Sequence, residues 1–228
     1  MQLCGRLAVA VDGRQVEEEL PGRQGRVLLG YLALNRLRTV TREEAIGAIW
    51  PDGRDGGLAP LLSKLRRVVP LEGLRPVADR VDVEVAAEGL HRAESALAQG
   101  DAHAAWAPAL VALFVYARPL LAGDEAPWLD EERRRFQGAH LRALEAYGGA
   151  TLGIGGTELG AAVRIGRRLV ELEPYRESGY RLLMEALDRE GNSAEALLVY
   201  EELRRRLHED LGVSPSDPTQ ALHRRLLR

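Results

Sequence analysis

The chain has 228 residues, of which 46% are hydrophobic and 29% are charged, so a disordered or collagen-like protein is excluded. Eleven aromatic residues stand against abundant Ala and Leu, which favours a mostly helical protein over a β-sandwich. The single cysteine, Cys4, rules out an internal disulfide. The longest apolar stretch, residues 110–116, is far shorter than the roughly 20 residues of a membrane span, and the first residues lack a secretion-signal pattern. We therefore expect a cytoplasmic protein without a membrane partner.

The formal net charge of −3 conceals an uneven distribution of charge along the chain. Residues 1–80 carry 13 Lys and Arg against 10 Asp and Glu, whereas the remaining residues carry 18 against 24. A mildly basic front part and an acidic rear part suggest two modules with different partners, although ordinary fluctuation of surface charge produces the same pattern.

The front part carries signals for a short β element followed by three helices. Asp12-Gly13 supplies the positive φ angles of a tight turn and predicts a hairpin made of residues 7–11 and 14–16. Apolar residues at helical spacing predict a first helix over residues 23–35. A capping box, in which Thr41 and Glu44 satisfy free amides, predicts a second helix from Thr41 to Trp50, which Pro51 ends.

The third predicted helix spans residues 58–69 and combines an apolar face with a basic face. Its apolar stripe is made of Leu58, Leu61, Leu62, Leu65, Val68 and Val69. On a helical wheel Ser63 and Arg67 lie opposite the stripe, and Lys64 and Arg66 lie on its flanks. After this helix, residues 74–83 predict either a very short hairpin, which we favour, or an extended linker.

This order of elements is typical of a winged helix, in which the last helix enters the major groove of DNA. Ser63, Lys64 and Arg67 are side chains that reach base edges and phosphates from one face of a helix, with Arg66 beside them. The plain alternative is a surface helix whose cations are merely solvated.

Two other parts of the front region add candidate contacts with the DNA backbone. Thr41 and Arg42 stand at a helix N-terminus, where free amides attract a phosphate, although capping alone explains Thr41. Arg75 and Arg80 are expected in the wing, within reach of the minor groove or the backbone.

The rear part predicts helix after helix, in a pattern that repeats. Gly100, Gly156 and Gly191 are each followed five residues later by Ala, at positions 105, 161 and 196, and the last two units are 35 residues apart. This spacing is typical of tetratricopeptide-like helical hairpins, in which small residues let paired helices approach closely. Pro174 ends a predicted helix where such a unit would end.

Catalytic motifs are scarce. The five histidines are scattered without metal-site spacing, and neither a nucleophile elbow nor a phosphate-binding loop of the Walker type occurs. We expect no enzyme activity, no cofactor and no metal ion.

Several segments resemble the OmpR-type winged helix of SARP-like bacterial regulators, and others resemble the bacterial transcriptional activator domain. The first resemblance is carried by residues 5–9, 20–24, 29–34, 40–44, 49–53 and 62–67. The second is carried by residues 119–123, 126–128, 177–187, 191–197 and 207–215. Together they imply a transcriptional regulator that binds promoter DNA through its third helix, often as a dimer on direct repeats. The segment from Arg75 to Val83 is shorter than the family's wing and lacks its aromatic residue.

The sequence therefore predicts a mainly α protein with a small N-terminal antiparallel β element, divided into two domains. Residues 1–83 are predicted as a winged helix-turn-helix domain and residues 84–228 as a tetratricopeptide-like bacterial transcriptional activator domain. The predicted partners are promoter DNA, RNA polymerase and a second copy of the chain. The alternative is an adaptor that does not bind DNA and holds a protein partner in the groove of its helical repeats.

Overall fold

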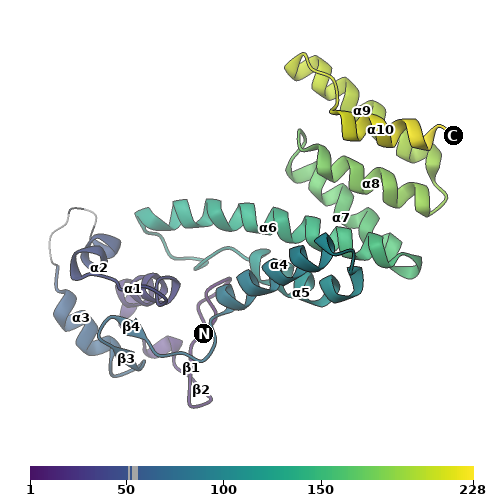
Figure 1. Ribbon diagram of the computed structural model, residues 1–228. Helices are drawn as coiled ribbons and strands as arrows, with labels where there is room; N and C mark the ends of the chain where they lie inside the picture. Colours follow the sequence, from purple (N-terminus) through teal and green to yellow (C-terminus); the bar gives the residue numbers. More distant parts are fainter. Residues whose placement is uncertain (51, 53–55) are drawn as a thin grey trace. The chain divides into compact units, whose positions relative to one another are not determined.

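The computed structural model describes residues 1–50, 52 and 56–228, which form a mainly helical protein with small antiparallel β elements (Figure 1). This confirms the predicted fold class at that level. The chain divides into two compact units. The front unit comprises Met1–Ala87 and Phe114–Ala139, and the rear unit comprises Glu88–Leu113 and His140–Arg228. Among the described residues, no helix is both long and apolar enough to cross a lipid bilayer.

The front unit opens with the predicted hairpin. Strand β1 (Ala10–Val11) pairs antiparallel with β2 (Arg14–Gln15), with Ala10 opposite Gln15. Asp12 and Gly13 adopt φ angles of 50° and 79°, as the Asp-Gly turn requires. The strands are shorter than predicted, and a 3₁₀ turn (Glu17–Glu19) follows them.

The first two helices agree with their sequence signals. Helix α1 (Gly22–Leu34) packs against α2 (Arg42–Ile49). The capping box is present, because Thr41 Oγ1 accepts from the Glu44 amide and the Glu44 carboxylate accepts from the Thr41 amide. Pro51, predicted to end this helix, lies outside the described residues, and Trp50 is the C-cap.

The third helix is shorter than predicted. Helix α3 spans Leu58–Leu65, and the chain then continues in i to i−3 turns, with the amides of Arg67 and Val68 donating to Lys64 and Leu65. The prediction that the α-helix extends to residue 69 is therefore wrong. The chain leaves the helix at Leu65 and turns before strand β3 begins at Leu71.

The hairpin after α3 exists but lies earlier in the chain than predicted. Strand β3 (Leu71–Glu72) pairs with β4 (Arg75–Pro76), and Gly73 in the turn has a φ of 63°. The predicted second strand is wrong, because residues 82 and 83 already belong to helix α4 (Asp82–Ala98). The positive φ of Gly73 is the local signal that fixes the turn at this position.

A segment from far along the chain completes the core of the front unit. After helix α5 (Ala102–Tyr116), residues 117–126 lead to the start of α6 (Pro127–Ile154). Leu120, Leu121 and Leu129 are buried in the same cluster as leucines of α1 and α3. Phe114–Ala139 thus belongs to the compact front unit, which is made of two separate stretches of the chain. The sequence, in contrast, predicts two continuous domains with one boundary between residues 83 and 84.

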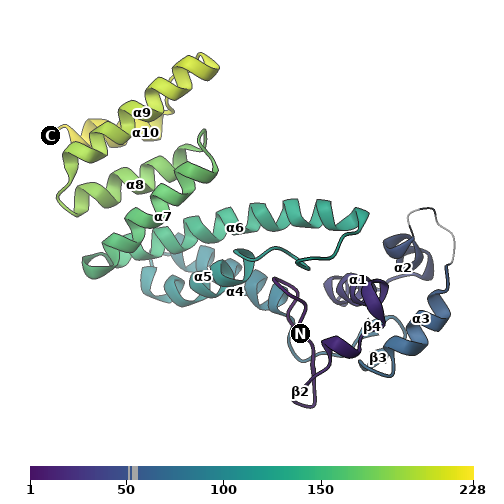
Figure 2. The same cartoon turned by 180° about the vertical axis from the view of Figure 1, so that it is seen from behind.

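The rear unit contains paired helices joined by short loops, which Figures 1 and 2 show as a stack of antiparallel elements from α7 to α10. These elements are α7 (Leu159–Leu172), α8 (Glu177–Arg189), α9 (Ser193–Leu211) and α10 (Asp217–Leu226), preceded by a 3₁₀ turn (Gly156–Glu158). Helix α7 ends at Leu172, two residues before Pro174, as predicted. In the described chain, every strand precedes Val77.

Glycines permit the close approach of α7 and α8. A Cβ on Gly166 would lie 2.8 Å from Leu183 Cβ, and a Cβ on Gly179 would lie 2.8 Å from Leu169 Cβ. The two contacts are reciprocal, as antiparallel pairing requires. The repeated alanines 105, 161 and 196 are all buried, so the small-residue pattern marks the packed faces of the helices.

Candidate nucleic-acid interface

Helix α3 has one buried face and one solvent face. Leu58, Leu61, Leu62 and Leu65 are at most 9% exposed, whereas Ser63 and Lys64 are exposed. The leucines pack in the front core, so they fix the rotation of the helix about its axis. The polar side chains then necessarily face solvent.

Two cations beside this face carry uncompensated charge. Lys64 and Arg67 are both exposed, and neither side chain forms an ion pair or hydrogen bond with any residue that the structure describes. Arg67 lies one turn beyond Lys64, in the turn that follows α3. Lys64 is also the single lysine of the chain. This pair offers donors for an anionic partner.

Arg66 has a structural contact of its own. Its Nη2 donates to the Gly73 carbonyl at 3.0 Å, so its guanidinium joins the end of α3 to the turn of the β3–β4 hairpin. Arg66 and Arg67 therefore differ in their contacts, although the side chains of both are exposed: Arg66 binds the hairpin, and Arg67 does not.

The N-terminus of α2 is already capped by protein groups. The carboxylate of Glu44 accepts from the Thr41 amide at 2.8 Å and from Arg38 Nη1 at 2.8 and 3.0 Å. The backbone hydrogen bond from Thr41, together with Arg38, lowers the pKa of Glu44. Thr41 and Arg42 are exposed at this end of the helix, so the other described residues do not cover them against the predicted contact with the DNA backbone.

The two arginines assigned to the wing lie in different places. Arg75 is exposed in β4 and stands opposite Glu72 in the hairpin register. Arg80 lies outside the hairpin, in the segment before α4, where its carbonyl accepts from the amino group of Met1 at 2.8 Å. The placement of Arg80 in a wing is therefore wrong, because the hairpin closes at Pro76.

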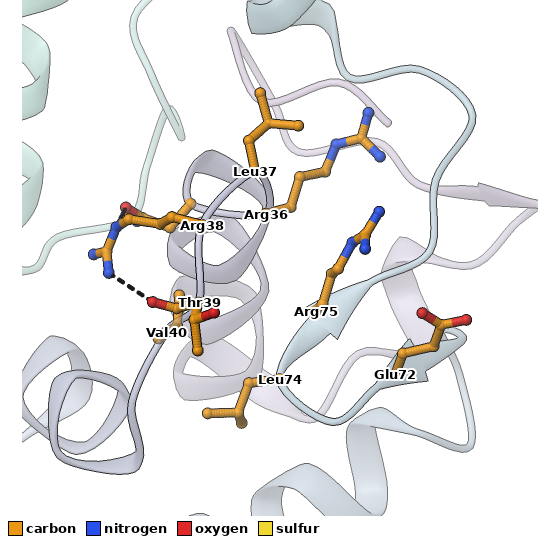
Figure 3. Close-up of a pocket in the computed structure, with 9 residues that line it drawn as sticks. Arg36, Leu37, Arg38, Thr39, Val40, Glu72, Leu74 and Arg75 are labelled. Atoms are coloured by element: carbon orange, nitrogen blue, oxygen red, sulfur yellow. Dashed lines mark hydrogen bonds between the residues drawn. The ribbon is translucent and has the colours of Figure 1, made fainter.

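A hollow between the α1–α2 turn and the hairpin brings Arg75 together with residues that the sequence did not single out as candidates. Figure 3 shows Arg36, Leu37 and Arg38 on one side and Glu72, Leu74 and Arg75 on the other. Arg36 donates to both carboxylate oxygens of Glu84 and to the Ala78 carbonyl, and Arg38 is held by Glu44. Two of the three cations are therefore neutralised, and the hollow alone indicates no ligand. The signal available in the sequence was Leu37, a leucine between two arginines, which is 82% exposed.

Metal-binding side chains do not converge in the described residues, where no cluster of three or more His, Cys, Asp or Glu could hold an ion.

Known proteins resemble this chain over nearly its whole length. The regulatory protein AfsR of Streptomyces griseus is 33% identical over 218 residues, which cover 90% of this chain and 22% of AfsR. The transcriptional regulatory protein EmbR of Mycobacterium tuberculosis is 28% identical over 250 residues, covering 99% of this chain and 62% of EmbR. The chain thus spans about a fifth of AfsR and less than two thirds of EmbR. AfsR is thus named as a regulatory protein and EmbR as a transcriptional regulatory protein.

A solved structure shares the fold. The structure of Mycobacterium tuberculosis EmbR in complex with a low-affinity phosphopeptide superposes with a TM-score of 0.81 at 23% identity, covering 100% of this chain and 64% of that chain. The sequence model of the family described as "Bacterial transcriptional activator domain" matches residues 81–227. The matched residues make up most of the chain. The chain therefore belongs to the bacterial transcriptional activator domain family.

Proposed function

We propose that the chain is a DNA-binding regulator of transcription whose helix α3 enters the major groove of promoter DNA. The observation that carries the proposal is a pair of exposed cations, Lys64 on the solvent face of α3 and Arg67 in the turn that follows, which have no partner among the described residues. Four buried leucines hold the opposite face of α3 in the core, so Lys64 sits on a rigid element and Arg67 directly follows it. Cations free of carboxylate partners are suited to neutralising phosphates and donating to guanine.

The surrounding elements support a winged-helix arrangement. Helices α1 to α3 are followed directly by the β3–β4 hairpin, which Arg66 joins to the end of α3 through the Gly73 carbonyl. In this arrangement the bases or phosphates are contacted by Ser63, Lys64 and Arg67. The DNA backbone is contacted by Thr41 and Arg42 at one place and by Arg75 at another. Arg66 acts mainly by holding the hairpin. Arg80 contributes at most long-range charge.

The rear helices would then serve contacts with protein. The stacked pairs from α7 to α10 bury their own cores, which is typical of tetratricopeptide-like repeats with a free outer surface. We propose RNA polymerase or a second copy of the chain as the partner of these helices, and a cytoplasmic location for the complex. The adaptor alternative is favoured by one observation, the two-residue strands of the hairpin, which make a very short wing.

A binding site selected from random duplexes tests this proposal. The full chain is incubated with a random library, the selected duplex is labelled, and binding is followed by fluorescence anisotropy at two salt concentrations. We expect Arg67→Ala to lose about 1–3 kcal/mol at one base position if Arg67 reads a base, or to weaken all sequences equally with a shallower salt slope if it contacts phosphate. Lys64→Ala is tested in the same way.

The matched control is Arg205→Ala, which removes an exposed arginine of α9 that also has no ion-pair partner in the described chain. This variant should bind like the wild type. Equal binding by all variants would remove the α3 face from the mechanism. Failure of the wild type to bind any duplex at low salt would favour the adaptor.

A further inference from the structure

Trp128 makes a contact with helix α2 that reaches across 80 positions of the sequence. It lies in the first turn of α6, and its indole Nε1 donates to the Ala48 carbonyl at 3.2 Å. Ala48 belongs to the last turn of α2, where carbonyl groups have no partner within the helix. The indole therefore satisfies a polar group at the C-terminal end of α2.

The same ring also packs on α1. The rings of Trp128 and Tyr31 meet edge to face, with centroids 5.3 Å apart and an interplanar angle of 69°. Trp128 thus touches both helices that precede α3, with its apolar ring on α1 and its polar edge on α2.

The end of α2 is connected to the start of α3 by a second indole. Trp50 is the C-cap of α2, and a Cβ on Gly56 would lie 2.5 Å from Trp50 Nε1, so the indole packs directly on this glycine. Gly57, the next residue, is the N-cap of α3, with a φ of 114°. The direction in which α2 ends is therefore transmitted to the point at which α3 begins.

The segment that carries Trp128 is itself firmly held. Arg133 of α6 donates to the carbonyls of Leu120, Leu121 and Asp124 at 3.1, 3.1 and 2.8 Å. The Asp124 carboxylate, which is buried, also accepts from Arg26 of α1. Trp128 is therefore presented to α2 from a fixed support rather than from a free loop.

We infer that Trp128 is a positioning residue for DNA recognition, which sets the orientation of α3 through the end of α2. The inference rests on the proposed function. Contacts with base edges need atomic precision, whereas contacts with phosphates tolerate small shifts. Loss of the indole N–H should therefore reduce discrimination between DNA sequences more than it reduces affinity for DNA in general.

The test compares Trp128→Phe with the wild type on the selected duplex and on an unrelated duplex. Phenylalanine keeps a ring against Tyr31 but has no N–H donor. We expect the ratio of the two affinities to fall by about three- to tenfold, with unchanged affinity for the unrelated duplex. A structural role alone would lower the melting temperature and leave the ratio unchanged, which would overturn the inference.

Trp106→Phe is the matched control, because Trp106 of α5 likewise donates its indole N–H to a distant residue, Glu158, and packs on a tyrosine, Tyr147. It should leave the ratio unchanged, and an equal fall would overturn the inference. Gly56→Ala is an independent second variant, since its methyl displaces the Trp50 ring, and it should lower the ratio as Trp128→Phe does. If the wild type binds both duplexes equally, or binds neither, the proposed function itself is contradicted. If the wild type prefers the selected duplex and Trp128→Phe shows the same preference, only the inference about Trp128 is contradicted.

Discussion

The side chain of Leu121 occupies the space that a Cβ on Gly30 would need. A Cβ built on Gly30, in the middle of α1, would lie 2.4 Å from Leu121 Cδ1 and 3.3 Å from Leu121 Cγ. Leu121 is fully buried and adopts a φ of 44°, so it has little room to move. A glycine that weakens α1 as an isolated helix is thus the residue that lets a distant segment dock on it.

Gly30→Ala should therefore destabilise the protein despite the better helix propensity of alanine. Overpacking costs about 1–3 kcal/mol, against a propensity gain of about 1 kcal/mol, so we expect a net loss in the free energy of unfolding. Gly47→Ala in α2 is the control, since nothing lies within 4 Å of its added Cβ, and it should stabilise the protein slightly. Urea unfolding of both variants measures the two signs. A stabilised Gly30→Ala variant would show that Leu121 is free to move aside.

The ion pair between Asp124 and Arg26 should contribute more to stability than its neighbour on the surface. The Asp124 side chain is 5% exposed, and its Oδ1 lies 2.9 Å from Arg26 Nη2, which is partly open to solvent. We expect Asp124→Asn to cost about 1–3 kcal/mol, because it leaves a cation without its buried partner. Glu125→Gln, which breaks the exposed pair with Arg23, should cost less than about 0.5 kcal/mol. Equal melting temperatures of Asp124→Asn and Glu125→Gln in thermal unfolding would contradict this interpretation.

A fragment of residues 84–228 should fold only in part. Its helices α7 to α10 keep their own clusters of buried residues, so a cooperative transition should remain. Leu120, Leu121 and Leu129, however, lose the front residues on which they pack. Hydrogen exchange should be slow in α7 to α10 and markedly faster over residues 117–139 than in the whole chain. Equal protection of residues 117–139 in both proteins would show that this segment belongs to the rear unit.

Local signals in the sequence predicted the elements whose cause is itself local. The Asp12-Gly13 turn and the Thr41 capping box each depend on a few adjacent residues, and both are present. The end of α3 and the register of the β3–β4 hairpin were mispredicted, because apolar periodicity continues past Leu65 although the backbone does not.

The role of residues 114–139 could not be read from the sequence. Leu121 on Gly30 and Trp128 on Ala48 are contacts between segments about 80 to 90 positions apart, and periodicity carries no information on such pairs. For the candidate interface, the sequence predicted the exposed face of α3. It placed Arg66 on the flank of the apolar stripe and Arg67 opposite it, but it did not predict that Arg66 donates to the Gly73 carbonyl of the hairpin.

Acid should weaken the attachment of α10 through Glu177. Burial by itself raises the pKa of this carboxyl, but hydrogen bonds from Ser216 and Thr219 and the charge of Arg181 lower it below the ordinary value of 4.5. The unfolded chain therefore binds the proton more readily, so the stabilisation is present above pH 4.5 and is lost as the pH falls through the lowered pKa.

Glu177→Gln should accordingly lower the urea midpoint at neutral pH and make it less sensitive to acid. The control is Glu171→Gln, because the Glu171 side chain is 66% exposed in its pair with Arg168. The urea midpoint of this variant should depend on pH as that of the wild type does. An unchanged pH dependence in Glu177→Gln would contradict the assigned cause.

The most direct test of DNA binding through α3 uses the fact that Lys64 is the single lysine of the chain. The protein is treated with an amine-acetylating reagent with and without the selected duplex, and modification is followed by mass spectrometry. The amino terminus of the chain serves as the internal control. Because the Lys64 ammonium would lie against DNA, we predict that the duplex slows acetylation of Lys64 but not of the amino terminus, and that protein acetylated at Lys64 binds more weakly. Equal acetylation rates of Lys64 with and without bound duplex would contradict the placement of α3 in the groove.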